Sequence, residues 1–338
     1  MKIIIPMAGM GKRMRPHTLT LPKPLISIAG KSIVQRLVED IVKVSNETVE
    51  EIAFIVGDFG KEVEEKLIHI ATKLGAEAKI YYQHQPLGTA HALLCAAPSL
   101  EGKITVAYAD TLFKADFTLN EKEDGVIWVH KVNNPEQFGV VKLDAQNYII
   151  DFIEKPQNFI SDLAIVGIYY FKDGAYLRSE IQFLVDNNIS KNDEYQLTDA
   201  LQNMMKKGTR FAIDRVNEWL DCGNKDATVF TNQRILELAQ MGNQVAENAK
   251  IINSIIIPPC FISRETEIVN SIIGPHVSVE KNTFISHSIV TNSIIESHSH
   301  ILNANIDNSM IGNFVEYSGE ILDVSIGDYT TIKKTSNA

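Results

Sequence analysis

Four basic side chains near the start of the chain could hold a polyphosphate. Lys12, Arg13 and Arg15 belong to a glycine-bearing turn after a short apolar run, and Lys23 stands between two prolines. Glycines in such a turn let the backbone approach a ligand closely and expose its N–H groups. Fixed positive charge beside exposed N–H groups favours phosphate binding. The segment therefore predicts a cradle for a phosphorylated ligand.

The glycine turn does not match the two common nucleotide fingerprints. A dinucleotide-binding turn would need a third glycine at the position of Met14. The phosphate-loop pattern GxxxxGK[ST] is also absent from this segment. By itself, a GxG turn after a strand is weak evidence for any nucleotide site, so the cations carry most of the argument.

Two aspartates at the ends of apolar stretches could hold a divalent cation. Asp110 ends the run ITVAYAD, and Asp221 stands in EWLDCGN. Taken alone, each could be a turn or capping residue. Together they supply the one or two carboxylates that Mg²⁺ takes from a protein while phosphate oxygens fill other positions. The pair therefore predicts Mg²⁺ bound beside a phosphorylated substrate.

A third group of residues could recognise a nucleobase. Gln83 carries an amide that both donates and accepts hydrogen bonds, which suits the edge of a base. Gly88 permits close approach of the backbone, and Thr89 could cap the helix that follows. A capped helix after a loop is an equally simple interpretation of these residues alone.

Alternating strands and helices must position these side chains. Apolar, β-branched runs predict buried strands at 2–5, 52–57 and 103–110. Amphipathic patterns predict helices at 31–44 and 60–75. This order implies an α/β fold with a doubly wound, mostly parallel sheet, which binds ligands beyond the carboxyl ends of its strands. From 126 to 171 strands follow one another without helices, so we expect a mixed sheet there.

A different pattern begins after Gln244. Apolar residues recur at six-residue steps, at Ile256, Ile262, Ile268, at Ile273, Val279, Ile285, and at Ile289, Ile295, Ile301. Serines that begin Ser-Ile-Ile or Ser-Ile-Val recur every seventeen residues, at Ser254, Ser271 and Ser288. Three such steps make one coil of a parallel β-helix. The sequence is similar to hexapeptide-repeat left-handed β-helices, with fewer glycines. It predicts an α/β domain over 1–243 and a β-helix over 244–338.

Composition narrows the function further. The net charge of −10 argues against a nucleic-acid partner, which requires a basic surface. Cys95, Cys222 and Cys260 are odd in number and show no CxxC spacing, which argues against disulfides and zinc. No signal peptide precedes the first strand, and no apolar run reaches about twenty residues. We therefore expect a soluble cytoplasmic protein without a membrane partner.

The string GMGKRMRPHTLTLPKPL at 9–25 resembles the signature of the sugar-1-phosphate nucleotidylyltransferases, G-x-G-x-R followed by P-K-P-L. Six motifs in the family's order extend the resemblance over roughly residues 1–240. The resemblance implies a Rossmann-like nucleotidyltransferase fold. It also implies a Mg²⁺-dependent enzyme that transfers a nucleotidyl group from a nucleoside triphosphate to a hexose 1-phosphate and releases pyrophosphate.

The resemblance also implies roles for individual residues. Nucleotide-binding positions match Ala8, Gly9, Gly11, Arg13, Gln83, Gly88, Thr89 and Asp110. Sugar-phosphate positions match Gly139, Glu154, Lys155 and Tyr169. By resemblance, Arg13 holds the triphosphate, Lys23 stabilises the α-phosphate and Lys155 aligns the sugar phosphate in catalysis. Asp110 and Asp221 match the metal ligands, although Ala109 stands where many relatives have glycine.

The substrates remain open between two alternatives. The motifs look most like thymidylyl- or uridylyltransferases that use dTTP or UTP with glucose 1-phosphate. Mannose-1-phosphate guanylyltransferases share many of the same strings and can also carry a β-helix. The sequence therefore favours dTTP or UTP with glucose 1-phosphate and leaves guanylate transfer to mannose 1-phosphate as the alternative.

Two alternatives from other classes also remain. One is a non-catalytic scaffold that oligomerises through the β-helix; the intact set of predicted catalytic residues counts against it. The other is an acyltransferase activity in the β-helix, but its histidines lie in no recognisable acetyl-transfer setting. The four histidines are His276, His287, His298 and His300. Solenoids with exposed apolar ends often associate, so we expect a homo-oligomer.

Overall fold

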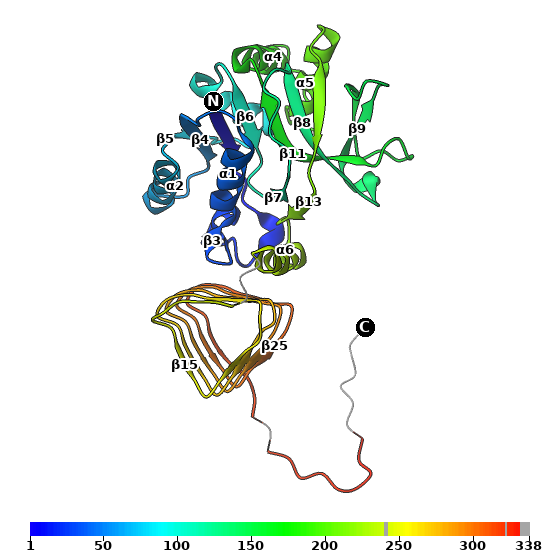
Figure 1. Ribbon diagram of the computed structural model, residues 1–338. Coiled ribbons are helices and arrows are strands. Elements are labelled where there is room, and N and C mark those ends of the chain that lie inside the picture. Colours follow the sequence, from blue (N-terminus) through cyan, green and yellow to red (C-terminus); the bar gives the residue numbers. More distant parts are fainter. Residues whose placement is uncertain (240–242, 322, 332–338) are drawn as a thin grey trace. The chain divides into compact units, whose positions relative to one another are not determined.

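The computed structural model describes residues 1–239, 243–321 and 323–331, and it divides the chain into two compact units, Met1–Thr231 and Asn232–Ala338. The first unit is built on a nine-stranded sheet (Figure 1). Its strands are β1 (Lys2–Pro6), β4 (Glu51–Val56), β5 (Glu77–Tyr82), β6 (Ile104–Ala107), β8 (Gly125–Lys131), β9 (Gly139–Leu143), β10 (Ile149–Glu154), β11 (Leu163–Phe171) and β12 (Phe211–Arg215).

The sheet combines a parallel half with a largely antiparallel half. Strand β1 lies between β4 and β6 and runs parallel to both, and β5 extends this half beyond β4. Strand β11 then pairs antiparallel with β6, β8 and β9. The β9–β10 pair is a hairpin, and β12 runs parallel to β8. The expected mixed, Rossmann-like sheet is confirmed.

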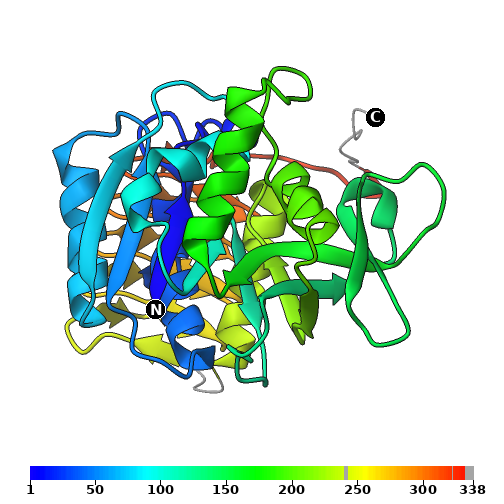
Figure 2. The same cartoon turned by 90° about the horizontal axis from the view of Figure 1, so that it is seen from above.

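Helices cover the sheet because its central strands are apolar on both faces. They are α1 (Ile33–Val44), α2 (Lys61–Lys73), α3 (Thr89–Cys95), α4 (Gly174–Asp186) and α5 (Leu197–Lys206), while α6 (Lys225–Leu238) follows later in the chain and extends past the end of the first unit. Ile4 in β1 packs in one core with Leu93 of α3, Leu177 of α4 and Leu201 of α5. Figure 2 shows α4, drawn in green, lying over the strands. These helices hold β1 rigidly behind the turn that follows it.

A two-stranded sheet extends the first unit beyond the end of β6. Strand β7 (Thr111–Lys114) pairs antiparallel with β13 (Glu218–Asp221). In this register Asp221 lies opposite Thr111, the residue directly after Asp110. A second short pair joins β2 (Ser27–Ile28) to β3 (Lys31–Ser32) ahead of α1. The β7–β13 pair therefore brings two aspartates that are distant in sequence to the same place.

The second unit contains a left-handed parallel β-helix with three faces (Figure 1). One face consists of β14 (Asn243–Val245), β17 (Cys260–Ile262), β20 (Val277–Val279), β23 (Ile294–Ile295) and β26 (Met310–Ile311). The next consists of β15 (Lys250–Ile252), β18 (Glu267–Val269), β21 (Phe284–Ser286), β24 (His300–Leu302) and β27 (Glu316–Ser318). The third consists of β16 (Ile255–Ile256), β19 (Ile272–Ile273), β22 (Ile289–Val290) and β25 (Asn305–Ile306).

Stacked apolar side chains fill the β-helix, as the six-residue period predicts. Ile268, Ile285 and Ile301 lie one above another and are fully buried. The prediction for Ile289 is wrong, because its side chain is 45% exposed and Val290 is buried instead. The β-helix steps by five residues at this corner, so the neighbouring position turns inward.

The corners of the β-helix explain why glycine is sparse. Asn253, Asn270, His287 and Asn303 stack at one corner with φ between 46° and 51°. Asparagine tolerates this left-handed conformation better than most residues, so it replaces glycine here. Each of the repeated serines directly follows one of these corner residues in the sequence. The N–H of Ser271 donates to Ser254 Oγ and that of Ser288 to Ser271 Oγ, both at 3.0 Å.

No helix among the described residues is long and apolar enough to span a membrane.

Candidate functional site

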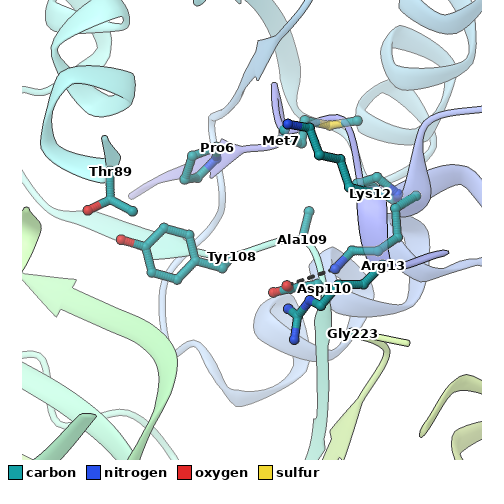
Figure 3. Close-up of a pocket in the computed structure, with 13 residues that line it drawn as sticks. Pro6, Met7, Lys12, Arg13, Thr89, Tyr108, Ala109, Asp110 and Gly223 are labelled. Atoms are coloured by element: carbon teal, nitrogen blue, oxygen red, sulfur yellow. Dashed lines mark hydrogen bonds and ion pairs between the residues drawn. The ribbon is translucent and has the colours of Figure 1, made fainter. Parts of the chain in front are cut away.

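A cavity of ≈ 480 Å³ opens at the carboxyl ends of β1 and β6 (Figure 3). It is lined by Pro6, Met7, Gly9, Gly11, Lys12, Arg13, Lys23, Pro24, Thr89, Tyr108, Ala109, Asp110 and Gly223. Six of these residues were predicted as site residues, namely Gly9, Gly11, Arg13, Lys23, Thr89 and Asp110. The cavity is therefore lined by some of the residues that the sequence predicts to bind phosphate, nucleobase and metal.

The glycine turn is shaped by close packing at Gly11. Gly11 has φ +55° and precedes the short 3₁₀ helix Lys12–Met14. Its carbonyl accepts a hydrogen bond of 2.8 Å from Thr18 Oγ1. A Cβ at this position would lie 3.1 Å from Lys23 Cβ and from Thr18 Cγ2. A side chain at position 11 would therefore strain the turn and press on Lys23.

Lys23 forms an ion pair inside the cavity. Its Nζ lies 2.8 Å from Asp110 Oδ2, which the dashed line in Figure 3 marks. The Lys23 side chain is 11% exposed and that of Asp110 is 36% exposed. Pro22 and Pro24 flank Lys23 at the start of a 3₁₀ helix and restrict its backbone. The backbone that carries the lysine is therefore restricted.

Asp221 lies beside this ion pair without lining the cavity. Burial raises the pKa of Asp221, and the negative charge of Asp110 raises it further. The N–H of Gly223 donates a hydrogen bond of 2.9 Å to Asp221 Oδ1. This bond and the charges of Lys23 and Arg13 partly lower the pKa again. Two carboxylates and two cations therefore share one electrostatic environment.

The two carboxylates fit a magnesium ion that arrives with phosphates. No cluster of three or more His, Cys, Asp or Glu side chains among the described residues could hold a metal. Mg²⁺ needs only one or two protein carboxylates when phosphate oxygens and water complete its shell. A bound divalent cation would relieve the repulsion between Asp110 and Asp221. Both aspartates would hold the ion, and all of their donor atoms are oxygen, as Mg²⁺ prefers.

The predicted nucleobase residues form a network behind the cavity. Gln83 Nε2 donates to Gly88 O at 3.2 Å and lies 3.2 Å from His91 Nδ1. Gly88 has φ +99°, and a Cβ there would lie 2.5 Å from Tyr195 O. Gly88 is therefore needed for the approach of a distant backbone segment and not only for a ligand. Gln83 is half-buried and tied to this segment.

The prediction that Thr89 caps its own helix is wrong. Helix α3 starts at Thr89 with Gly88 as its cap residue and without a side-chain capping bond. Instead, the N–H of Ala90 donates to Tyr195 O at 2.9 Å. The hydroxyl of Thr89 accepts a hydrogen bond of 3.0 Å from the N–H of Leu197, the first residue of α5. Helix α3 therefore satisfies a donor at the start of α5, and the segment that precedes α5 satisfies a donor of α3.

Tyr108 is a site residue that the sequence analysis missed. Its ring lines the cavity, and its hydroxyl points toward Thr89 (Figure 3). Burial raises the pKa of Tyr108. The tyrosine directly precedes Ala109 and Asp110, and of these residues the sequence pointed to Asp110 for ligand binding. Lys12, one of the four cations expected to hold phosphate, also lines the cavity, and Pro6, Met7, Pro24 and Gly223 are further lining residues without a predicted role.

The predicted sugar-phosphate residues lie outside the cavity lining. Gly139 pairs with Glu154 across the β9–β10 hairpin, and a Cβ at Gly139 would lie 2.9 Å from Glu154 Oε2. Lys155 is exposed, with φ +45°. The ring of Tyr169 meets that of Tyr108 edge to face, with centroids 5.9 Å apart. Burial raises the pKa of Tyr169, as do the charges of Tyr108 and Glu154.

The structure therefore places the predicted residues in two groups. Tyr169 contacts Tyr108 on the cavity side and is close to Glu154 on the hairpin side. Ala8, Gln83, Gly88 and Asp221 stand beside the lining residues in sequence or in space, but they do not line the cavity. The aromatic pair is the structural link between the cation-rich cavity and the hairpin.

The fold and the cavity define an α/β protein of the nucleotidyltransferase type, with clustered cations after β1 and two neighbouring carboxylates beyond β6 and at the end of β13. The chain belongs to the nucleotidyl transferase family, whose model matches residues 2–237. The resemblance to sugar-1-phosphate nucleotidylyltransferases is thereby confirmed at the level of the family.

Curated relatives carry several different names. The chain is 31% identical over 267 residues to the bifunctional protein GlmU of Methanococcus vannielii, covering 76% of this chain and 61% of the relative. It is 32% identical over 247 residues to the low-salt glycan biosynthesis nucleotidyltransferase Agl11 of Haloferax volcanii, covering 70% and 66%. It is 31% identical over 231 residues to the mannose-1-phosphate guanylyltransferase catalytic subunit beta of Drosophila melanogaster, covering 66% and 59%.

A solved structure shares the fold. It is a Bacillus anthracis protein assigned as a glucose-1-phosphate thymidylyltransferase, in complex with a sucrose. The TM-score is 0.59 at 22% sequence identity, and the match covers 72% of this chain and 96% of that chain. At this identity the likeness concerns the fold alone. The chain spans only about 60% of the length of the GlmU relatives that it matches.

Proposed function

We propose that the protein is a sugar-1-phosphate nucleotidylyltransferase, a nucleotide-sugar pyrophosphorylase. The observation that carries the proposal is the meeting of Arg13, Lys23 and Asp110 around one cavity, with Lys23 bonded to Asp110 at 2.8 Å and Asp221 beside this ion pair. Cations that bind phosphates and carboxylates that bind a metal are the two groups that nucleotidyl transfer requires. Catalytic residues would come from residues 1–243, and residues 244–338 would serve assembly.

In this reaction an oxygen of the sugar phosphate attacks the α-phosphorus of the triphosphate. The new phosphorus–oxygen bond forms as the bond to the β-phosphate breaks, and pyrophosphate leaves with the electron pair. No protein nucleophile is required, because the attacking phosphate is already anionic. Catalysis is therefore positioning and neutralisation of charge. Mg²⁺ held by Asp110 and Asp221 would supply further neutralisation of the phosphates.

The chain's own residues divide the remaining work. Arg13 would hold the triphosphate and then the leaving pyrophosphate. Lys23 would move from Asp110 to the α-phosphate and stabilise the charge that develops there. Lys155 would align the sugar phosphate for attack. The turn at Ala8, Gly9 and Gly11 would offer backbone N–H groups to the phosphates.

The remaining predicted residues would select the substrates. Gln83, Gly88 and Thr89 would contact the nucleobase, while Gly139, Glu154 and Tyr169 would contact the sugar. Their support is geometric, since Tyr169 meets the cavity residue Tyr108 and lies close to Glu154. The aromatic pair would lie where the sugar adjoins the nucleotide.

We favour dTTP or UTP as the nucleotide and glucose 1-phosphate as the sugar substrate. Transfer of guanylate to mannose 1-phosphate is the second candidate, because one relative at 31% identity carries that name. A non-catalytic scaffold is the competing class. The β-helix exposes apolar side chains such as Ile255, which is 60% exposed, and a homo-oligomer through this unit is part of the proposal.

Pyrophosphate release tests the proposal. The full chain is incubated with Mg²⁺ and each of dTTP, UTP, GTP, CTP and ATP, together with the 1-phosphates of glucose, galactose, mannose and N-acetylglucosamine. Strong release with one pair is expected and names the substrates. Asp110→Asn is the control that should remove the signal. Absence of release from folded wild-type protein with every pair would favour the scaffold.

A further inference from the structure

The ion pair of Lys23 and Asp110 engages the carboxylate that the proposed function gives to the metal. Lys23 Nζ is bonded to Asp110 Oδ2 at 2.8 Å, and only 11% of the lysine side chain is exposed. The flanking prolines limit the freedom of its backbone to withdraw the ammonium group. In the absence of ligand, Asp110 is therefore already neutralised by a fixed internal cation.

The second carboxylate is also balanced by fixed charge. Asp221 feels the negative charge of Asp110 and the positive charges of Lys23 and Arg13. Arg13 and Lys12 line the same cavity. A free divalent cation entering here meets three cations and competes with Lys23 for Asp110. A buried ammonium that loses its partner is unfavourable, and like charges repel strongly where solvent is excluded.

A metal ion bound to a nucleoside triphosphate interacts differently with the same site, because the triphosphate brings negative charge. The complex remains negatively charged overall, so the cations of the cavity attract it. Its phosphate oxygens offer Lys23 and Arg13 new charge-assisted hydrogen bonds as Asp110 is released. The lysine therefore exchanges one anionic partner for another. The free-energy cost of leaving its ammonium group unpaired, which opposes binding of a free metal ion, does not arise.

We propose that Lys23 is the resident counter-charge of Asp110, so that the site takes its metal as the nucleoside triphosphate complex and not as the free ion. This inference rests on the proposed function, which assigns Asp110 and Asp221 to the metal. Thermodynamic linkage requires the effect to be mutual, so metal and nucleotide each raise the affinity of the protein for the other.

Binding of Mn²⁺ to the full chain without nucleotide is the direct test, with free Mn²⁺ measured by electron paramagnetic resonance. Wild-type protein should bind weakly, and Lys23→Met should bind at least about tenfold more tightly, which corresponds to about 1.4 kcal/mol. Lys12→Met is the matched control. It removes a lysine from the same cavity lining outside the ion pair, and should change the affinity less than about threefold.

Two further measurements locate the effect. Adding Asp110→Asn to Lys23→Met should abolish the gain, because Asp110 is the carboxylate that the lysine releases. Adding nucleoside triphosphate to wild-type protein should raise its Mn²⁺ affinity at least about tenfold. Lys23→Gln replaces Lys23→Met if thermal denaturation shows that the methionine variant is unfolded.

The outcomes separate this inference from the proposed function. Mn²⁺ affinity of Lys23→Met equal to or below that of wild type overturns the counter-charge role, even if wild-type protein releases pyrophosphate. A gain of tenfold supports the role even if no tested substrate pair reacts. Failure of the proposed function is seen only in the pyrophosphate assay, and failure of the inference only in metal binding.

Discussion

The hydroxyl of Thr89 accepts a hydrogen bond of 3.0 Å from the N–H of Leu197, although 108 residues separate them. This bond ties the first turn of α3 to the first turn of α5, and the N–H of Ala90 completes the exchange by donating to Tyr195 O. Thr89 also lines the cavity, beside Tyr108 (Figure 3). The same side chain thus supports the fold and the site.

Thr89→Val should destabilise the first unit by about 1 kcal/mol, because the N-terminal N–H of α5 loses its acceptor. The valine is close to isosteric, so packing changes little. Chemical denaturation of the full chain measures the loss. Thr89→Ser keeps the hydroxyl and should retain wild-type stability within about 0.5 kcal/mol. Equal stability of the valine variant and wild type would contradict the reciprocal capping.

Gly88→Ala should destabilise the protein by about 2 kcal/mol or more, because the new Cβ would lie 2.5 Å from Tyr195 O. Gly208→Ala is the matched control. Gly208 has nearly the same φ, +101° against +99°, but a Cβ there meets nothing within 4 Å. The control therefore carries the backbone strain alone, about 1 kcal/mol. Coinciding denaturation midpoints for the two variants would show that the backbone at Tyr195 moves away from the new Cβ at little energetic cost.

Lys155→Ala should lower kcat by more than about tenfold if Lys155 aligns the sugar phosphate. The side chain is exposed, so the thermal midpoint should stay unchanged. Steady-state kinetics with the best substrate pair provides the measurement. Lys142→Ala, which removes an exposed lysine from the neighbouring strand β9, should retain activity within about twofold. Turnover of Lys155→Ala within tenfold of wild type removes Lys155 from the mechanism.

Asp214→Asn should stabilise the protein at pH 7. Burial, together with the negative charge of Glu123, raises the pKa of Asp214 to about 6, and its Oδ2 is buried without a hydrogen-bond partner. The folded state binds this proton more tightly than the unfolded state. The stabilisation is therefore fully present below the unfolded pKa of about 4 and is lost as pH rises through about 6.

Urea titrations from pH 3.5 to 7.5 measure this dependence. Wild type should lose about 1–2 kcal/mol relative to Asp214→Asn across the window, after allowance for the partial exposure of the carboxyl group. Asp58→Asn, at an exposed aspartate, should follow the wild-type curve. Parallel curves for wild type and Asp214→Asn would show that the carboxyl titrates normally in the folded protein.

Ser271→Ala should destabilise the β-helix by about 1–3 kcal/mol. Its hydroxyl accepts from the N–H of Ser288 and donates to Val269 O, and the side chain is almost fully buried. The alanine would leave the N–H of Ser288 without this acceptor, whereas Val269 O would still accept from the N–H of His287. Differential scanning calorimetry should show the loss, while Ser318→Ala, at an exposed serine, should leave the transition unchanged. Equal transition temperatures for the two variants would show that the stacked serines do not stabilise the β-helix.

The sequence by itself determined the features that depend on neighbouring residues. The apolar run of β1, the glycine turn and the proline-flanked Lys23 are local, so they could be predicted along with the cations that line the cavity. The β-helix was predictable for a related reason. Its period is repeated many times, and each coil packs only on its neighbours. The period did not settle which of Ile289 and Val290 turns inward, because a corner can shorten by one residue.

The tertiary structure alone decided which distant residues meet. Asp221 reaches Asp110 through the β7–β13 pairing, and Gly88 and Thr89 meet Tyr195 and Leu197 through packing of α3 against α5. Such pairings depend on the burial of whole elements, which no local pattern encodes. Tyr108 was not predicted as a site residue for the same reason. From sequence alone, an aromatic residue at the end of a strand is most simply interpreted as part of the hydrophobic core. The sequence thus supplied the chemical groups, and long-range packing set their distances and their charges.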